Sequence, residues 1–236
     1  MLVDHFAWAF LETGSVLGQI CHFFGRLTGP VMAYLMAEGY HYTHSPKRYA
    51  VRLGVFAVLS WVPFVYFQYG VLPLFRSAED CSDFALSLSQ DLWFVPSFGV
   101  IYTLFLGFCA IWVWDKSKWP REVKFALMLL FCLLSIWGDW PVYDVLFCLI
   151  FYQYRDDKRT MWGCYAVLSA LYIGTAMASA EVWWESLYTF GMVLAPCVLE
   201  GMYTHEPGSK RRFYKWFFYV FYPTHLILLG IARWAV

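Results

Sequence analysis

Charged residues are scarce in this chain, at 14% of its 236 residues, where a soluble domain carries about a quarter. Hydrophobic residues make up 61% and aromatic residues 22%, and the mean hydropathy is +0.52. Because each membrane-spanning helix needs about 20 apolar residues, the composition predicts an all-α, polytopic helical membrane protein. We expect one integral membrane domain over residues 1–236. The formal net charge of zero gives no indication of nucleic-acid binding, and no such partner is expected.

The cysteines lack any spacing typical of a disulfide framework or a metal site. Of the 7 cysteines, Cys81 is alone in a polar loop and the others lie in apolar runs. No CxxC pair or His/Cys cluster occurs, and a disulfide-rich fold is therefore excluded. We expect no bound metal.

Apolar runs predict about eight to nine transmembrane helices. Glu12–Ser15 interrupts the first run, Met1–Phe24. Either this run is one imperfect span, or Asp4 and His5 end a helix that begins before this sequence, followed by a loop or interfacial helix. We favour the second interpretation, in which the first helix is incomplete. The remaining expected spans are Leu27–Tyr42, Tyr49–Leu74, Trp93–Trp114, a short span ending at Trp137, Val142–Tyr154, Met161–Ala178, Val182–Tyr203 and Trp216–Trp234.

Two features of this pattern are unusual. Val142–Tyr154 is well short of the usual spanning length, which predicts a re-entrant or heavily buried helix. An acidic loop separates the third and fourth expected spans, at residues 76–91.

Lysine and arginine concentrate in alternate turns, which predicts the topology. By the positive-inside rule these turns are cytoplasmic, so the N-terminus is expected inside and the C-terminus outside. The residues on the cytoplasmic side are Lys47, Arg48, Arg52, Lys116, Lys118, Arg121, Lys124, Arg155, Lys158, Arg159, Lys210, Arg211, Arg212 and Lys215.

Ionisable residues inside the spans are the functional candidates, because each is costly in hydrocarbon unless it is paired or hydrated. On the second expected helix, Arg26, Pro30, Tyr34, Glu38 and His41 fall within an arc of about 120°. Arg26 and Glu38 lie about 18 Å apart along the axis. We therefore interpret this polar face as one wall of a path across the membrane, not as a single catalytic cluster.

Other ionisable residues lie inside the spans or at their ends. We interpret Asp144 and Glu200 as structural and keep the rest as functional candidates. The full set is Asp4, His5, Asp139, Asp144, Glu200 and His225.

A series of short motifs in a fixed order runs along the chain. Together they resemble the TraX family over nearly the whole sequence. The motifs are Asp4-His5, Gly25-Arg26 with Pro30, Glu38-Gly39 with His41, Arg52-Leu53, Tyr102-Thr103-Leu104 with Gly107, the Asp139 turn, Phe151-Tyr152 before Arg155, and Tyr222-Pro-Thr-His225-Leu226.

The resemblance implies a bacterial inner-membrane acetyltransferase that transfers acetyl from cytoplasmic acetyl-CoA to an exported acceptor, such as a pilin N-terminus. Acyl transfer needs a base and donors for the oxyanion. The candidate base is His5, with Asp4 or Asp139 orienting it and His225 as a second active-site residue. Arg26 is the candidate for the acceptor carboxylate or the oxyanion. In the alternative interpretation, Asp4 and His5 lie at a solvated helix end, His225 makes an interhelical hydrogen bond, and Arg26 is a snorkelling arginine.

The cytoplasmic end of the proposed path is assigned to the donor. Glu38 and His41 are candidates for binding CoA or relaying a proton, with a structural pair as the alternative. Arg48 and Arg52 suit the CoA phosphates, although the positive-inside rule alone also explains them.

Two other classes of function fit the same sequence. Intramembrane His, Asp, Glu and Arg also occur in transporters and proton-coupled carriers. A membrane assembly factor without enzymatic activity would require none of the polar residues.

Overall fold

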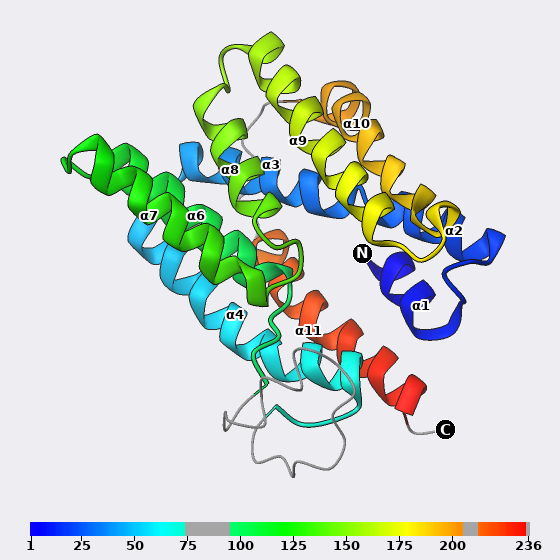
Figure 1. The fold of residues 1–236 in the computed structure, drawn as a ribbon. Coiled ribbons are helices and arrows are strands. Elements are labelled where there is room, and N and C mark those ends of the chain that lie inside the picture. The colour runs from blue at the N-terminus through cyan, green and yellow to red at the C-terminus, as the bar shows by residue number, and fades with distance from the viewer. Residues whose placement is uncertain (74–94, 205–211, 235–236) are drawn as a thin grey trace.

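The computed structural model describes residues 1–73, 95–204 and 212–234, without the side chains of 212–215. This part of the chain is all-α, as expected, apart from one isolated bridge between Phe98 and Gly138. The acidic loop of residues 76–91, Lys210 and Arg211 lie outside the described residues. In order (Figure 1), the helices are α1 (Leu2–Phe10), α2 (Val16–Gly25), α3 (Thr28–Tyr42), α4 (Pro46–Tyr69), α6 (Val100–Lys116), α7 (Arg121–Leu134), η3 (Ser135–Trp137), α8 (Tyr143–Gln153), α9 (Lys158–Ser179), η4 (Trp183–Leu194), α10 (Ala195–Met202) and α11 (Arg212–Trp234).

The first apolar run forms two short helices instead of one span. Ser15 caps α2, because its hydroxyl accepts a hydrogen bond from the Gly18 amide, and the interrupting residues 11–15 form the turn between α1 and α2. The favoured interpretation allowed a loop or an interfacial helix here, and the structure has the helix α2. The chain then passes through Arg26 and Leu27, both with right-handed helical dihedral angles, into α3.

Capping residues set the ends of the longest helices. Ser45 caps α4, with Pro46 in its first turn, and α4 ends at Gly70, which adopts φ 70°. Asp157 caps α9 through the Thr160 amide. The turn expected at 44–48 is therefore shorter, because Pro46 is favourable in the first turn of a helix.

The expected eighth span, Val182–Tyr203, corresponds to an uninterrupted helical run over residues 183–202. The run winds first as η4, a 3₁₀ helix of 12 residues, and continues directly as α10, with Pro196 in the first turn of α10. The tighter winding brings Gly191 against the backbone of Phe23 in α2, where an added Cβ atom would overlap the Phe23 carbonyl. A glycine at position 191 therefore allows η4 to pack closely on α2.

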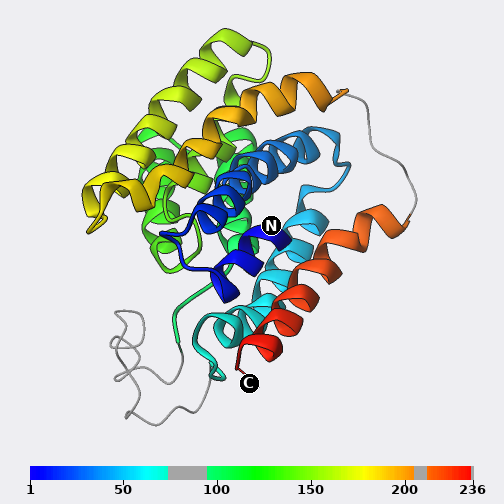
Figure 2. The ribbon, with the colours of Figure 1, turned by 90° about the vertical axis from the view of Figure 1, so that its right-hand side faces the viewer.

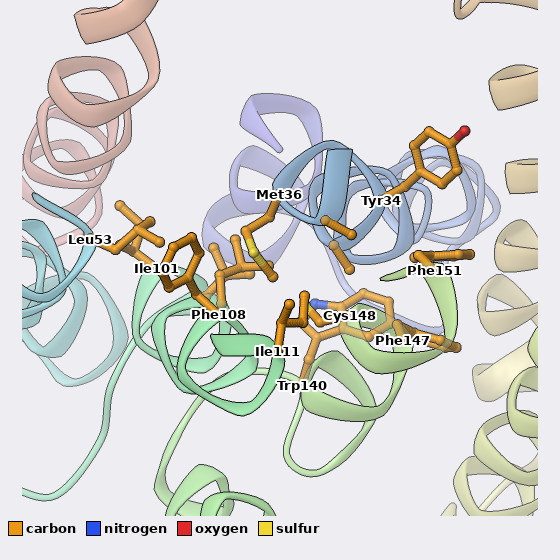
Figure 3. Close-up of a cluster of buried hydrophobic side chains, with 14 of the residues drawn as sticks. Tyr34, Met36, Leu53, Ile101, Phe108, Ile111, Trp140, Phe147, Cys148 and Phe151 are labelled. Carbon is orange, nitrogen blue, oxygen red and sulfur yellow. The ribbon is translucent and has the colours of Figure 1, made fainter. Parts of the chain in front are cut away.

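The helices surround a core that is rich in aromatic residues. α4 and α11 run parallel, since Arg52 bonds Tyr219 near their first turns and Trp234 bonds the Phe67 carbonyl near their last. α3 packs on α6 and α8 through the buried side chains drawn in Figure 3. The N-terminus lies near the middle of the molecule in both ribbon views (Figures 1 and 2).

Two of the described helices are long and apolar enough to cross a membrane, α4 and α9. The short helix expected at Val142–Tyr154 is confirmed as α8, with 11 residues. The expected count of eight to nine spans stays a prediction, because among the described helices only α4 and α9 are long and apolar enough by themselves and α3 has only 15 residues.

Gly191→Ala should destabilise the protein by about 2 kcal/mol or more, because the new methyl group forces η4 away from α2. Gly174→Ala is the matched control: Gly174 lies in α9 with open space around it, and the substitution should be neutral or stabilising by about 0.5–1 kcal/mol. Thermal unfolding in detergent measures both. Equal stability of the two variants would contradict the tight contact between η4 and α2.

Candidate functional site

The carboxylate of Asp4 joins two cationic or ionisable side chains. One carboxylate oxygen accepts from Nδ1 of His22 at 2.8 Å, and the other accepts from Nη2 of Arg26 at 3.2 Å. All three residues are buried. Gly25 makes room for this arrangement, because a Cβ atom at that position would overlap the Asp4 side chain.

Aromatic side chains enclose the guanidinium of Arg26. It lies 5.0 Å from the ring centroid of Trp140 and 5.3 Å from that of Tyr188, and Nη1 donates to the Tyr172 hydroxyl at 3.2 Å. Cation–π contacts of this kind strengthen when water is excluded. Arg26 is therefore a fixed, buried cation and does not snorkel to a surface.

Two histidines from opposite ends of the chain form a dyad. Nδ1 of His5 and Nε2 of His225 are 2.7 Å apart, and Nδ1 of His225 lies 2.8 Å from the Phe221 carbonyl oxygen. A carbonyl only accepts, so His225 carries its proton on Nδ1, and its Nε2 accepts from His5. In this neutral pair the lone pair of His5 is on Nε2. His5 is thus held in the tautomer that a general base requires.

A strained turn lies between η3 and α8 and carries Trp140. Trp140 and Val142 are the non-glycine residues with positive φ in the described chain, at 59° and 68°. The Tyr143 amide bonds the Pro141 carbonyl, which makes Val142 the centre of a γ-turn of the rare positive-φ type. Strain of about 1–3 kcal/mol per such residue persists where surrounding structure fixes it. Here the turn directs the Trp140 ring to Arg26.

Asp139 begins this turn. Its amide donates to the Phe98 carbonyl at 2.8 Å, which ties the turn to the segment before α6. Burial raises the pKa of the Asp139 carboxyl to about 6, against the opposing attraction of Arg26.

Asp144 is buried, and the number of hydrogen-bond donors around it indicates that its carboxyl group is protonated. Oγ1 of Thr103 lies 3.0 Å from the Val100 carbonyl and 2.7 Å from Oδ2 of Asp144, yet a hydroxyl has a single hydrogen. Both contacts are satisfied together when Thr103 donates to Val100 and Asp144 donates to Thr103. Oδ1 of Asp144 has no partner among the described residues, where a carboxylate would be a costly unpaired charge.

A cavity of about 770 Å³ lies between α3, α4, α6 and α11. Met1, Thr28 and Tyr222 line one end, and Tyr42 and Arg52 line the other. Its walls are mostly apolar, and its volume falls within the usual range for small-molecule sites. Since the His5 amide bonds the Met1 carbonyl, the first end of the cavity lies one helical turn from the histidine dyad.

Arg52 is held in place beside the cavity. Its Nε donates to the Tyr219 hydroxyl at 3.1 Å, and the guanidinium lies 4.8 Å from the ring centroid of Tyr49. Arg48, by contrast, is exposed and does not line the cavity. The two arginines predicted to bind the donor therefore have different positions.

The C-terminal end of α3 carries a separate polar cluster. Glu38 is buried and accepts from Nε and Nη2 of Arg155 and, at 3.3 Å, from the Tyr203 hydroxyl. The bonds to Glu38 raise the pKa of Arg155 above its ordinary value. His41 is exposed and stacks on Tyr152, with ring centroids 5.0 Å apart. Glu38 is thus paired with Arg155 instead of His41.

Comparison with known proteins identifies the family. Residues 1–233 match the family described as TraX protein. The chain belongs to the TraX family. A relative named "Probable fimbrial assembly protein FimC, serogroup H1", from Dichelobacter nodosus, is 27% identical over 238 residues, which cover 99% of this chain and 91% of the relative. No solved structure matches.

The geometry of this TraX chain alters two of the sequence interpretations. The cavity follows a face of α3 roughly 140° away from Arg26, Glu38 and His41, so the predicted polar wall does not line it. Those side chains turn instead toward α8, α9 and the N-terminal helices, where they find hydrogen-bonding or stacking partners. His5 is oriented by His225, in place of Asp4 or Asp139, because Asp4 is already shared by His22 and Arg26.

Several residues of the site were missed from the TraX sequence. His22 precedes Arg26 by one helical turn, and this i, i+4 spacing was the available signal. Tyr172 and Trp140 carried no local signal, since their roles depend on contacts between distant helices. Arg155 stood in one of the family motifs, but its pairing with Glu38 was not predicted.

Asp144→Asn should change the free energy of unfolding by less than about 1 kcal/mol, because a neutral amide can donate the same bond to Thr103. Asp4→Asn is the contrasting variant and should cost about 3–5 kcal/mol, because it leaves Arg26 buried without its counter-charge. Thermal unfolding in detergent compares them. An equally large loss for Asp144→Asn would show that Asp144 carries a charge.

Proposed function

We propose that this TraX protein is a membrane-embedded acyltransferase that moves an acetyl group from acetyl-CoA to an acceptor of the cell envelope. The observation that carries the proposal is the His5–His225 dyad beside the end of a large cavity. A base with its lone pair fixed and a nearby cavity for a second substrate are what acyl transfer requires.

In this proposal His5 is the general base. Nε2 of His5 takes a proton from the acceptor amine or hydroxyl as that group attacks the thioester carbonyl. The C–S bond then breaks, and the same proton passes from His5 to the departing CoA sulfur. His225 holds the ring in place and stabilises the imidazolium through its Nε2 lone pair. The fixed cation of Arg26 supplies the positive field for the developing oxyanion or for an acceptor carboxylate.

The cavity supplies the donor route. Its lining follows α3 from Leu27 to Thr43, an axial length of about 24 Å. The mostly apolar walls suit the pantetheine arm, and Arg52 at the far end suits a phosphate group. Acetyl-CoA would therefore enter beside Arg52 and present its thioester near Met1.

The position of the basic turns supports an entry from the cytoplasm. Contacts of Tyr40 with Asp115 and of Glu38 with Arg155 gather the ends of α3, α6 and α8 at one end of the bundle, together with the basic residues that follow α6 and α8. By the positive-inside rule this end faces the cytoplasm, where CoA is made. The protein would then lie in a bacterial cytoplasmic membrane, with the histidine dyad toward the outer side.

The acceptor is inferred from the relative. The D. nodosus protein is named for fimbrial assembly, and a pilin N-terminus is an exported amine that fits an outward-facing site. A role in pilus assembly without catalysis is the second candidate, and the relative's name is the observation that favours it.

His5→Ala should lower acetyl transfer by about 10²- to 10⁴-fold, the usual contribution of a general base. The assay uses purified protein, radiolabelled acetyl-CoA and an N-terminal pilin peptide. His44→Ala is the matched control, because His44 is exposed in the turn before α4, and it should keep full activity.

The same assay separates the candidates. No label transfer by the unaltered protein would favour the assembly role, and unchanged transfer by His5→Ala would exclude His5 as the base. Uptake of substrate into vesicles without its modification would indicate a carrier.

Arg52→Ala should raise the KM for acetyl-CoA about tenfold or more with little change in kcat, because a charge-assisted bond to phosphate is lost from donor binding. Arg48→Ala, on the exposed face of the same helix, should leave both constants unchanged. Steady-state kinetics over a range of acetyl-CoA concentrations measure the difference. Equal effects of the two variants would place the phosphates elsewhere.

A further inference from the structure

His22 is a third buried histidine in this site, and the proposed reaction does not yet use it. It is fully buried, and the rings of Trp8 and Tyr188 lie 4.3 and 5.3 Å from its ring centroid. A histidine in a packed core normally has both ring nitrogens satisfied. Here Nδ1 bonds Asp4, while Nε2 has no partner among the described residues.

The bond to Asp4 fixes the tautomer of His22. A carboxylate only accepts, so the proton of neutral His22 is on Nδ1 and the lone pair is on Nε2. A carboxylate that holds Nδ1–H in this way stabilises the imidazolium when Nε2 takes up a proton. Asp4 and His22 thus have the arrangement of an acid–base pair.

A second unpartnered nitrogen lies on the same side of α2. Nε of Arg26 is buried and has no partner in the described chain, and Arg26 follows His22 by four residues, on the same helix face. Both residues contact the ring of Tyr188. Nε2 of His22 can accept a hydrogen bond from an N–H donor such as an ammonium, whereas Nε of Arg26 is itself a donor and suits a separate acceptor group.

We propose that His22, oriented by Asp4, is a second acid–base residue of the acyl-transfer site, where it removes the first proton from an ammonium acceptor. This inference rests on the proposed acyl transfer. The ammonium gives one proton to Nε2 of His22 and becomes a neutral amine. The amine then attacks the thioester carbon, so that a C–N bond forms and the C–S bond breaks. The second nitrogen-bound proton passes through His5 to the CoA sulfur.

Two bases are needed because each imidazole has one lone pair. A protonated amine loses two protons during acylation, one before the attack and one during it, and His5 accounts for only the second. The proton held on His22 is released to water after the product leaves. The positive charge of Arg26 assists the first step, because a nearby cation favours the neutral amine.

Several titratable groups lie around His22. Asp4 on α1 bonds its Nδ1 and Tyr188 on η4 packs against its ring, while Tyr172 on α9 and Asp139 in the turn before α8 interact with the neighbouring Arg26. The acceptor amine has an ordinary pKa of about 7.7–8.0, so the need for a base grows as the pH falls below 8.

The test compares two amide substitutions of His22 that separate its nitrogens. In His22→Asn the amide nitrogen takes the place of Nδ1 and keeps the bond to Asp4, but Nε2 is lost. In His22→Gln the amide lies near the position of Nε2 and does not titrate. We expect kcat/KM of His22→Asn at pH 6.5 to fall about twentyfold, because only about 5% of the amine is then neutral. At pH 9 it should lie within about twofold of the unaltered enzyme.

Other results would overturn the inference. If His22 only positions Asp4, His22→Asn keeps full activity at pH 6.5 and His22→Gln loses it. If His22 is only a packing residue, both variants lose activity by the same factor at pH 6.5 and pH 9. His44→Asn is the control and should follow the unaltered enzyme at both pH values.

A further variant tests the inference if the two amide variants do not fold. His22→Ala with added imidazole should regain activity at pH 6.5, and no recovery by a folded protein would count against the base. Absence of acetyl transfer by the unaltered protein would overturn the proposed function itself. A pH-independent loss of activity in the His22 variants alone would overturn only the role of His22.

Discussion

The carboxylate of Asp4 is the interaction on which the rest of the site depends. It accepts hydrogen bonds from His22 and Arg26 at the same time, and these bonds tie α1 to the junction of α2 and α3. A buried arginine without a counter-charge would be unstable by several kcal/mol. With it, Arg26 becomes a fixed cation, and α1 is fixed at the depth that brings His5 to His225.

The second constraint is the turn before α8, whose strain is used to position Trp140. An aromatic ring under Arg26 must enter between Gly29 on α3 and Tyr172 on α9, and positive φ angles at Trp140 and Val142 allow this approach. The bonds from Phe98 to both sides of Gly138 hold the turn in place. Backbone strain, a cation–π contact and an ion pair are therefore parts of one arrangement, and the TraX chain builds it from segments more than 100 residues apart.

Arg26 and Glu38 show which features of the site the sequence could predict and which it could not. The helical spacing of Arg26 and Glu38 correctly separated them into two clusters, since the rise per residue is fixed. Their shared face was interpreted as the wall of a route, yet the cavity follows another face of α3. Periodicity identifies residues on a common face, but the helices that pack there decide whether it is open. Here Arg155 and Tyr203 close it around Glu38.

The sequence by itself determined the all-α class, the short α8 and the family, and it singled out His5, His225 and Arg26 as candidates, because composition, period and motif order are local properties of the chain. It did not determine the 3₁₀ winding of η4, in which Gly191 lies against the backbone of α2. Nor did it reveal that His5 pairs with His225 while Asp4 pairs with His22. Neighbouring side chains on α1 point to different helices, and only the packing of α2 and α11 against α1 decides which partner each one meets.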